Sequence, residues 1–458
     1  MKNQDPLQLL LQEAGNVGRL DSEGSFTISG DAALGKLANF QLPRKSAWIL
    51  KIVQAAVTAE AAALSISQSN ETTTFVFYPE MEFGVDELKE ALLSPGLVGP
   101  RPVQHLAVGL RAVGFGDGRA FTLALDRQGV RTYFGWNGKE LAQRAEALPP
   151  EAPPRLTLGV AFPPEDMGRS LGGLAKGKGR ATEEYQEIVS NGEVCPIPLL
   201  FDGRRIDTMQ APHPDETLGN TATLSVGWTP YSEADGVPPL DLPKGMPERS
   251  TTWRPTDKFT DSRVFFFDGD LKQTHTKCIV KLRYGYKVES HRSKHRSFKF
   301  QSLKRRSFYA WVKDGVICHR EVSKIPVTPI SFEVYLSADG LQTDLTGFQI
   351  KEDAEYVRRA TLGKEQICFQ VENTLHALQE HIPRPFSLHA ATYGAVGLVF
   401  TLVAPMTVGK SLVGAFAFVG LALSAYDKKQ IMDDCAHHLR RLTDKLRHNP
   451  RPSFRRVE

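Results

Sequence analysis

The feature that most constrains this chain is a long apolar segment near its C-terminal end. Between Phe386 and Tyr426 the only charged residue is Lys410. A helix that spans a bilayer needs roughly 17–25 mainly apolar residues, so two such helices fit here with a break around Pro405. The length and the missing charges favour a membrane-inserted helical hairpin over the alternative, an apolar hairpin buried within a soluble domain.

The charges that flank this segment predict its orientation. Residues 427–458 contain nine Lys and Arg against five Asp and Glu. Because positive charge beside a membrane span favours the cytoplasmic side, both ends of the hairpin are expected in the cytoplasm. The rest of the chain would then lie on the cytoplasmic face of a membrane. Five widely spaced cysteines, an odd number, fit a reducing compartment.

The 458 residues are enough for several hydrophobic cores, and their patterning divides into four parts. Residues 1–192 mix helix-like and strand-like periods, and residues 193–383 are rich in strand-like segments. The apolar hairpin occupies 384–427, and a basic tail follows over 428–458. A helix is expected over 46–59, a flexible glycine-rich loop over 168–180, and a hairpin at CPIPLLFDGRRIDTM, which opens the second part.

One polar residue lies among apolar neighbours in the helix expected over 46–59, namely Gln54. After this helix come a strand, a strand–loop–helix unit, the glycine-bearing stretch QHLAVGLRAVGF, a hairpin, and finally a helix with PIPL. This order resembles the ATPase superfamily of gyrase, heat-shock chaperone, histidine kinase and mismatch-repair proteins (GHKL). The resemblance is closest to the ninety-kilodalton heat-shock chaperone and covers about residues 20–210.

The resemblance implies an α+β fold, in which a GHKL-type α/β sandwich precedes a second, middle-like α/β domain and the C-terminal apolar helical hairpin. It implies ATP with Mg²⁺ as cofactor, and it places Gln54 where the family has a metal-binding Asn. It places Ala107, Gly109 and Arg111 in the family's glycine-bearing phosphate loop.

The same comparison indicates that the hydrolytic chemistry is lost. Leu50 stands where the family has the Glu that activates water, and a leucine side chain cannot accept a proton. Tyr78 replaces the Asp that reads adenine, while Glu80 and Glu82 replace two glycines. Carboxylates at those two positions would repel phosphate. The resemblance therefore implies an ATPase-like architecture without turnover.

A second candidate interface is the strongly basic stretch over residues 272–313, which holds thirteen Lys and Arg and one acid, Glu289. Three interpretations remain open: a solvated sheet face, an anionic membrane surface, or a nucleic-acid interface with interleaved aromatic residues. The candidate contact residues are Lys281, Arg283, Arg292, Lys294, Arg296, Lys304, Arg305 and Arg306.

Possible metal ligands are few and lack paired spacing. His275 and Cys278 could approach Cys318 and His319 if their strands pair, and Cys435 lies near two histidines. Neither group shows the tight spacing of a structural zinc site, so no metal centre is predicted. A phosphate-loop-like match at 404–411 lacks the strand that such a motif requires.

These features predict a membrane-tethered, chaperone-like binding or sensing protein, and a role in stress or phage defence is a further hypothesis. We expect a protein partner or client, and a homodimer because the resembled family dimerises. The alternatives are a divergent ATP-binding conformational switch with slow hydrolysis, and a nucleic-acid-binding protein that uses residues 272–313.

Overall fold

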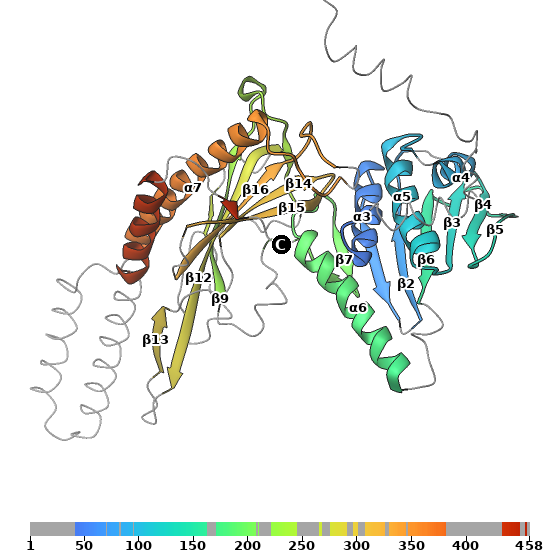
Figure 1. The fold of residues 1–458 in the computed structure, drawn as a ribbon, viewed down its shortest axis with the longest axis horizontal. Helices are drawn as coiled ribbons and strands as arrows, with labels where there is room; N and C mark the ends of the chain where they lie inside the picture. Colours follow the sequence, from blue (N-terminus) through green and yellow to red (C-terminus); the bar gives the residue numbers. More distant parts are fainter. Residues whose placement is uncertain are drawn as a thin grey trace, which may run out of the picture.

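The computed structural model describes residues 42–162, 171–207, 221–244, 265–267, 275–290, 296–300, 307–381, 433–448 and 454–455, with Met209 and with short gaps at 70, 82–83, 95, 326–328 and 345–346. These residues form a mixed α+β structure with two large sheets (Figure 1). We call residues 45–207 the first domain, and residues 221–381 with the helix over 433–448 the second domain.

Among the described residues, eight strands form the sheet of the first domain, in the order β5-β4-β3-β6-β2-β1-β7-β8. All neighbours are antiparallel except β1 and β7, which are parallel. The strands are β1 (Leu64–Gln68), β2 (Thr72–Phe77), β3 (Phe121–Arg127), β4 (Val130–Trp136), β5 (Leu141–Ala147), β6 (Arg155–Ala161), β7 (Leu199–Phe201) and β8 (Arg204–Arg205).

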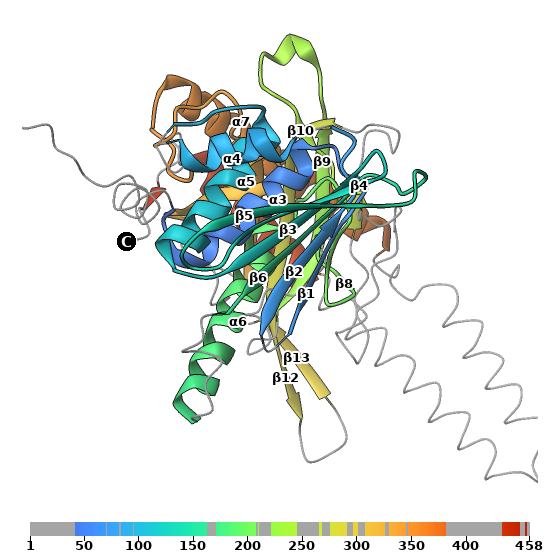
Figure 2. The same cartoon turned by 90° about the vertical axis from the view of Figure 1, so that its right-hand side faces the viewer.

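Helices cover one face of this sheet, and the strand patterns explain why. β2 alternates strictly between buried and partly exposed residues, as expected for a strand with one covered face. In Figure 2 the helices of this covering layer lie along the strands of the first sheet. It consists of η1 (Lys45–Ala47), α3 (Trp48–Thr58), α4 (Val85–Leu93), α5 (Arg101–Arg111) and the short π-helix η2 (Ala112–Gly116).

The second sheet has the order β11-β9-β12-β16-β14-β15-β17, with β10 and β13 also paired to β12. Two neighbouring pairs are parallel, β11 with β9 and β14 with β16. Its strands are β9 (Thr221–Pro230), β10 (Leu240–Asp241), β11 (Phe265–Phe267), β12 (His275–Ser290), β13 (Arg296–Phe300), β14 (Phe308–Lys313), β15 (Val316–Ser323), β16 (Ile330–Ser337) and β17 (Phe454–Arg455); η4 (Glu233–Asp235) lies between β9 and β10.

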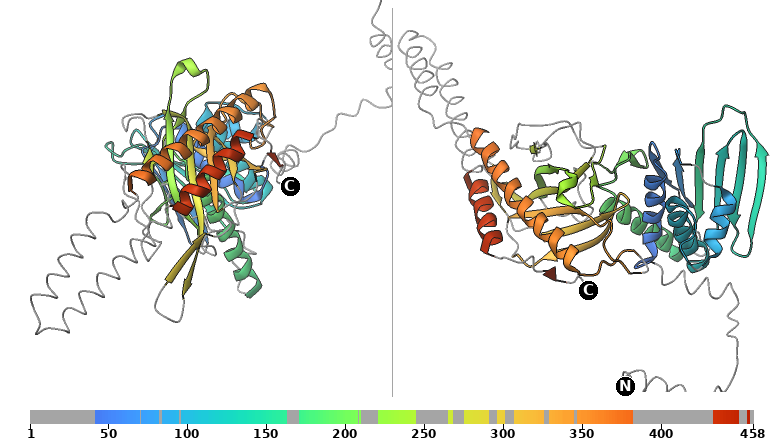
Figure 3. Two further views of the ribbon diagram at one scale, coloured as in Figure 1. Left: turned by 90° about the vertical axis from the view of Figure 1, so that its left-hand side faces the viewer. Right: turned by 90° about the horizontal axis from the view of Figure 1, so that it is seen from above.

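The long helix α7 (Ala354–His381) crosses one face of the second sheet, and the helix over 433–448 lies beside it (Figure 3). Cys435, Leu439, Leu442 and Leu446 of that helix are buried in the hydrophobic core. Within the predicted basic tail over 428–458, residues 433–448 therefore form a helix whose apolar stripe packs into the second domain.

Two other sequence expectations are corrected in the first domain. The glycine-rich loop predicted over 168–180 is helical from Leu171 onward, as the start of α6 (Leu171–Asn191). The boundary at residue 192 is too early, because β7 and β8 complete the first sheet. The hairpin predicted at CPIPLLFDGRRI is confirmed, since Phe201 pairs with Arg204 across an Asp202–Gly203 turn.

The predicted membrane hairpin over 384–427 lies outside the described residues. Within the part of the chain that the structure describes, no helix has both the length and the apolar character needed to cross a bilayer. Arg292, Lys294, Lys304, Arg305 and Arg306 of the basic stretch also lie outside it, as does the match at 404–411, and the side chain of Arg296 is not described.

Candidate functional site at the domain junction

Helix α3 is buried on both sides, because the first sheet covers one face and the second domain approaches the other. Trp48, Ile52 and Ala56 of the predicted apolar face are buried, but so is every other residue of the helix up to Ala56. Leu50, which resembles the general-base position, is also in the core with 1% of its surface exposed. In Figure 3 the strands of the first sheet and those of the second domain lie on opposite sides of α3.

Gln54 connects α3 to the second domain. Its Nε2 donates a hydrogen bond to the backbone carbonyl of Lys313 at 3.0 Å, and the side chain is almost fully buried. Lys313 ends β14, so the bond crosses from one domain to the other. A buried amide needs a hydrogen-bond partner, and here that partner is backbone of a residue far along the chain.

The turn between β14 and β15 is the part of the second domain that Gln54 contacts. Asp314 and Gly315 have φ values of 50° and 76°, and Lys313 pairs with Val316 across them. Two consecutive left-handed residues form the tight hairpin turn that Asp-Gly favours. A Cβ on Gly315 would lie 2.7 Å from Pro196 Cδ and 2.9 Å from Val57 Cγ2, so the turn fits closely against the first domain.

Charged side chains from α5 hold the same turn. The Asp314 carboxylate lies 2.8 Å from His105 Nε2 and 2.7 Å from an Arg101 guanidinium nitrogen. Arg101 also reaches Asp339 at 3.0 Å, after the end of β16. We call Lys51, Arg101, His105, Asp314 and Asp339 the interdomain charge cluster. It joins the N-terminal end of α5 to two loops of the second domain.

Burial and charge set the protonation states within this cluster. Burial lowers the pKa of His105, although the hydrogen bond to Asp314 acts in the opposite direction. Burial opposes ionisation of Asp314, but the His105 hydrogen bond and the nearby cations outweigh it and lower the Asp314 pKa. A neutral imidazole facing a carboxylate must donate, so His105 carries its proton on Nε2.

Lys51 is the least compensated cation of the cluster. Its Nζ lies 4.5 Å from the centre of the Phe348 ring, and only 6% of the residue is exposed. Burial lowers its pKa from 10.5 to about 8, and the nearby Asp314 and Asp344 recover only part of that shift. A charged amine here therefore destabilises the docked domains at neutral pH.

Replacing Lys51 with methionine is expected to raise the free energy of unfolding by ~1–3 kcal/mol at pH 7. Below pH 8 the lysine is charged in both the folded and the unfolded state, so its full penalty applies. Between pH 8 and 10.5 the folded protein loses the proton first, and the advantage of the variant should disappear. Urea unfolding from about pH 6 to about pH 10 measures this. A gain that does not change with pH would contradict the assignment.

Ala107, Gly109 and Arg111 do not form a phosphate loop, because all three lie within helix α5 and are buried. A Cβ on Gly109 would lie 2.9 Å from Ile52 Cδ1 and 3.2 Å from the Trp48 carbonyl oxygen. Gly109 thus permits the close contact of α5 with α3. The Arg111 guanidinium donates to the carbonyl of Ser94, the C-cap residue of α4. Burial lowers the Arg111 pKa.

Replacing Gly109 with alanine is expected to destabilise the protein by about 1–3 kcal/mol, despite the better helix propensity of alanine. The added methyl group would push α5 away from α3, because the backbone of Trp48 cannot move aside cheaply. Thermal unfolding measures the change. Gly179→Ala is the matched control, since a Cβ on Gly179 in helix α6 meets nothing within 4 Å. Equal stability of the two variants would contradict the packing role.

The segment that resembles the adenine-reading motif follows β2, and its backbone caps the C-terminal end of α3. The backbone N–H groups of Glu80 and Met81 donate to the Ala59 carbonyl at 3.0 and 3.2 Å. Tyr78 and Met81 are more than one-third exposed, and Glu82 lies outside the described residues. The segment therefore lies at the edge of the domain junction.

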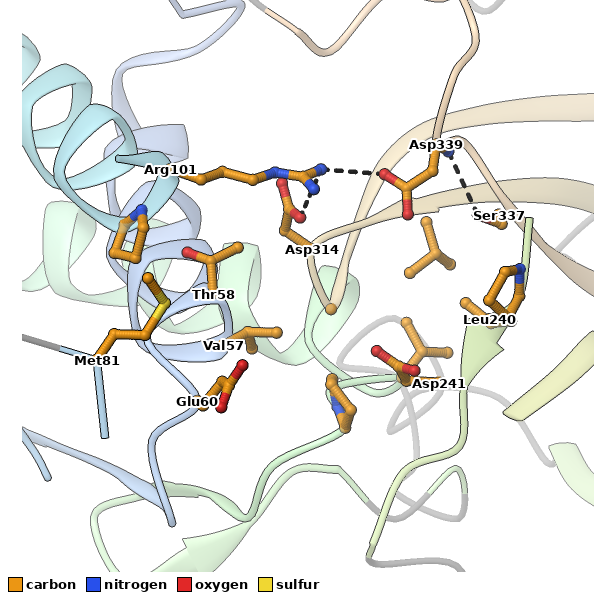
Figure 4. Close-up of a pocket in the computed structure, with 16 residues that line it drawn as sticks. Val57, Thr58, Glu60, Met81, Arg101, Leu240, Asp241, Asp314, Ser337 and Asp339 are labelled. Carbon is orange, nitrogen blue, oxygen red and sulfur yellow. Dashed lines mark hydrogen bonds and ion pairs between the residues drawn. The ribbon is translucent and has the colours of Figure 1, made fainter. Parts of the chain in front are cut away.

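A cavity of about 450 Å³ lies between the two domains at this point (Figure 4). The first domain supplies the end of α3, the Met81 segment and the start of α5. The second domain supplies β10, the β14–β15 turn and the loop after β16. Among the described residues, four carboxylates and one guanidinium line the cavity, namely those of Glu60, Asp241, Asp314, Asp339 and Arg101.

The predicted basic surface is wrong for Lys281 and Arg283, because both side chains are buried. Lys281 Nζ lies 3.1 Å from Glu193 and 3.6 Å from Glu333, and Arg283 lies 3.1 Å from Glu333. The Tyr335 hydroxyl lies 2.7 Å from a Glu193 carboxylate oxygen and 2.8 Å from a Glu333 carboxylate oxygen, and it can donate its one proton to either. These cations neutralise two buried acids, Glu333 of the second domain and Glu193 of the first domain, as buried charges generally require. They are not available to a membrane or a nucleic acid.

The cysteines and histidines considered as metal ligands do not gather. Burial raises the pKa of Cys278 and of Cys318 to about 12, which keeps both thiols protonated. His275 instead contacts the Asp241 carboxylate at 2.7 Å. Over the described ranges there is no group of three or more His, Cys, Asp and Glu side chains that could hold a metal ion.

No protein-family model and no curated protein matches this chain. Among solved structures, it is similar to the B subunit of DNA gyrase from Myxococcus xanthus, with a TM-score of 0.37 and 9% sequence identity. That match covers 74% of this chain and 91% of the gyrase chain. A TM-score this low carries no conclusion about the site, so its function is argued from its own geometry.

Proposed function

We propose that this protein is a binding or sensing protein without ATP turnover, whose ligand occupies the cavity at the domain junction. One observation carries the proposal: both domains line this cavity, whereas Leu50, Gln54 and Arg111, which resemble ATPase-site residues, are buried. A ligand held by both domains stabilises their docked arrangement, and this couples binding to the relative position of the domains.

In this proposal the protein has a GHKL-type architecture, and its helix layer serves domain docking instead of ATP hydrolysis. Leu50 packs in the core, and Gln54 holds the β14–β15 turn. Both positions therefore serve folding and domain docking. A water-activating base must reach a substrate, and a side chain at position 50 would instead face the packed interior.

A divergent nucleotide switch is the second candidate, and the position of Met81 favours it. Met81 belongs to the segment that resembles the adenine-reading motif, and it lines the cavity. The four cavity carboxylates argue against it, because they would repel a triphosphate.

Calorimetric titration of Mg-ATP into the full chain, combined with a phosphate-release assay, decides between the two candidates. We expect no saturable heat and no phosphate release above the protein-free control. ATP binding that Met81→Trp removes, with folding retained by circular dichroism, would favour the switch. Glu140→Gln is the control variant and should change nothing, because Glu140 is exposed in the loop between β4 and β5.

The membrane tether and the protein partner remain proposals that rest on the sequence. Deleting residues 386–426 is expected to move the protein from the membrane fraction to the soluble fraction. The charge-insertion variant Leu398→Arg with Leu412→Arg tests the same point without shortening the chain, because charge in a span opposes insertion. Retention of both variants in carbonate-washed membranes would contradict the tether.

A further inference from the structure

The chemistry of the cavity wall restricts which ligands the domain junction accepts. At one end, Arg101 bridges Asp314 and Asp339, so one guanidinium meets two carboxylates (Figure 4). Glu60 and Asp241 lie toward the opposite end. Within the described residues Glu60 forms no ion pair, and Asp241 contacts only the His275 imidazole. The negative charge of the cavity is therefore least compensated at the Glu60 end.

Most of the uncharged side chains that line the cavity are apolar. Val57 from α3 and Val312 from β14 line it, together with Leu240 and the exposed Met81. Thr58 adds little polarity, because its hydroxyl already donates to the Gln54 carbonyl at 2.7 Å. Apolar walls with a few charged groups are typical of small-ligand pockets of ~300–1,000 Å³.

The end of helix α3 adds to the same electrostatic preference. Thr58 is its last residue, and Thr58 and Glu60 both line the cavity, so the C-terminal end of the helix lies beside it. The negative end of a helix dipole favours a cation. The apolar wall, the carboxylates and the helix end all favour the same class of ligand.

We propose that the domain-junction cavity binds an organic cation, an alkyl amine or guanidinium group on an apolar arm, with the cationic head at Glu60 and Asp241. The apolar arm would lie against Val57 and Val312. This inference rests on the proposed function, since it names the ligand class of the same cavity. The cation can be a free small molecule or a basic side chain of a partner, because both carry the same group.

Three four-carbon probes that differ in charge test this inference on the full chain. They are n-butylamine, 1-butanol and butyrate, and the readout is the NMR signal of the Met81 methyl group in protein labelled with ¹³C-methyl methionine. Met81→Leu assigns that signal. n-Butylguanidine then represents a free guanidinium compound, and acetyl-Ala-Arg-Ala-amide represents the same group presented by a peptide.

We expect saturable shifts of the Met81 signal with n-butylamine and n-butylguanidine, and none with butanol or butyrate. Glu60→Gln and Asp241→Asn should each weaken n-butylguanidine binding about tenfold, because each removes a charged hydrogen-bond acceptor for the cationic head. Glu140→Gln is the matched control and should leave the affinity unchanged. Tighter binding of the peptide than of n-butylguanidine would indicate a cation carried by a partner protein, and the reverse would indicate a free compound.

Two negative results of these titrations lead to different conclusions. If butanol or butyrate binds and the amines do not, the cavity is a ligand site but the cation assignment is wrong. If no probe shifts Met81 at concentrations where the protein remains folded, both the cation assignment and the proposed function are wrong. Amine binding that is unaffected by Glu60→Gln and Asp241→Asn would place the cation elsewhere and also overturn the inference.

Discussion

Replacing Leu50 with glutamate is expected to unfold the first domain rather than to create a hydrolase. Leu50 has 1% of its surface exposed and belongs to the continuous core of the molecule. Burial raises the pKa of a carboxyl group by as much as ~3–5 units, and each unit corresponds to ~1.4 kcal/mol. The loss in free energy of unfolding should therefore be about 4 kcal/mol or more at pH 7. Urea unfolding followed by circular dichroism measures it.

The matched control for this experiment is Leu50→Met, which keeps the volume and the apolar character of the side chain. It should lower the stability by less than ~1.5 kcal/mol. The glutamate variant should also recover stability as the pH falls toward about 5, since the carboxyl of the unfolded chain then also becomes protonated and the protonated folded state is no longer at a disadvantage. A stable Leu50→Glu protein that gains Mg-dependent ATP hydrolysis would show that this face of α3 opens to substrate.

Replacing Glu184 with alanine is the second large effect, with an expected loss of ~3–5 kcal/mol. Glu184 lies in α6, and its carboxylate pairs with Arg119 at 2.6 Å while both residues are about 1% exposed. It also accepts hydrogen bonds from Trp48 Nε1 at 3.2 Å and from the Thr73 hydroxyl at 2.8 Å. Its removal would leave the Arg119 charge buried without this acid. Chemical unfolding measures this loss.

The neighbouring residue Glu183 provides a matched control, because it lies in the same helix turn but is exposed. Glu183→Ala should change the stability by no more than ~0.5 kcal/mol. The double variant Arg119→Leu with Glu184→Leu should be more stable than Glu184→Ala, since it removes both charges. If Glu184→Ala matches its control instead, the ion pair does not hold α6 to the sheet.

Local patterns of residue types account for the helix and the hairpin that the sequence predicts correctly. The apolar positions around Trp48 and Ile52 repeat with the period of a helix, and α3 forms there. The Asp202–Gly203 pair supplies two left-handed residues, and the β7–β8 hairpin follows from them. Both signals are local, because each depends on residues that are close together in the chain.

The sequence misassigns residues whose role depends on distant partners. A glycine in QHLAVGLRAVGF is compatible with a phosphate loop and with a close contact between two helices. The structure distinguishes these roles, because a Cβ on Gly109 would lie 2.9 Å from Ile52 Cδ1. A run of cations suggests a surface, but Lys281 meets Glu193 and Glu333 from other parts of the chain. Burial of a charge can be recognised only when its counter-ion is located.

The sequence by itself determined the helices and strands of both domains where their apolar period was clear, and it showed that Leu50 cannot act as a base. Only the tertiary structure decided what Gln54 does. From the sequence it is a polar residue in a buried helix, for which backbone or water is the simplest partner and a nucleotide is the alternative. The β14–β15 turn supplies the Lys313 carbonyl that accepts its hydrogen bond, from a position 259 residues further along the chain. That contact forms because the two domains pack together, and local periodicity contains no information about packing between domains.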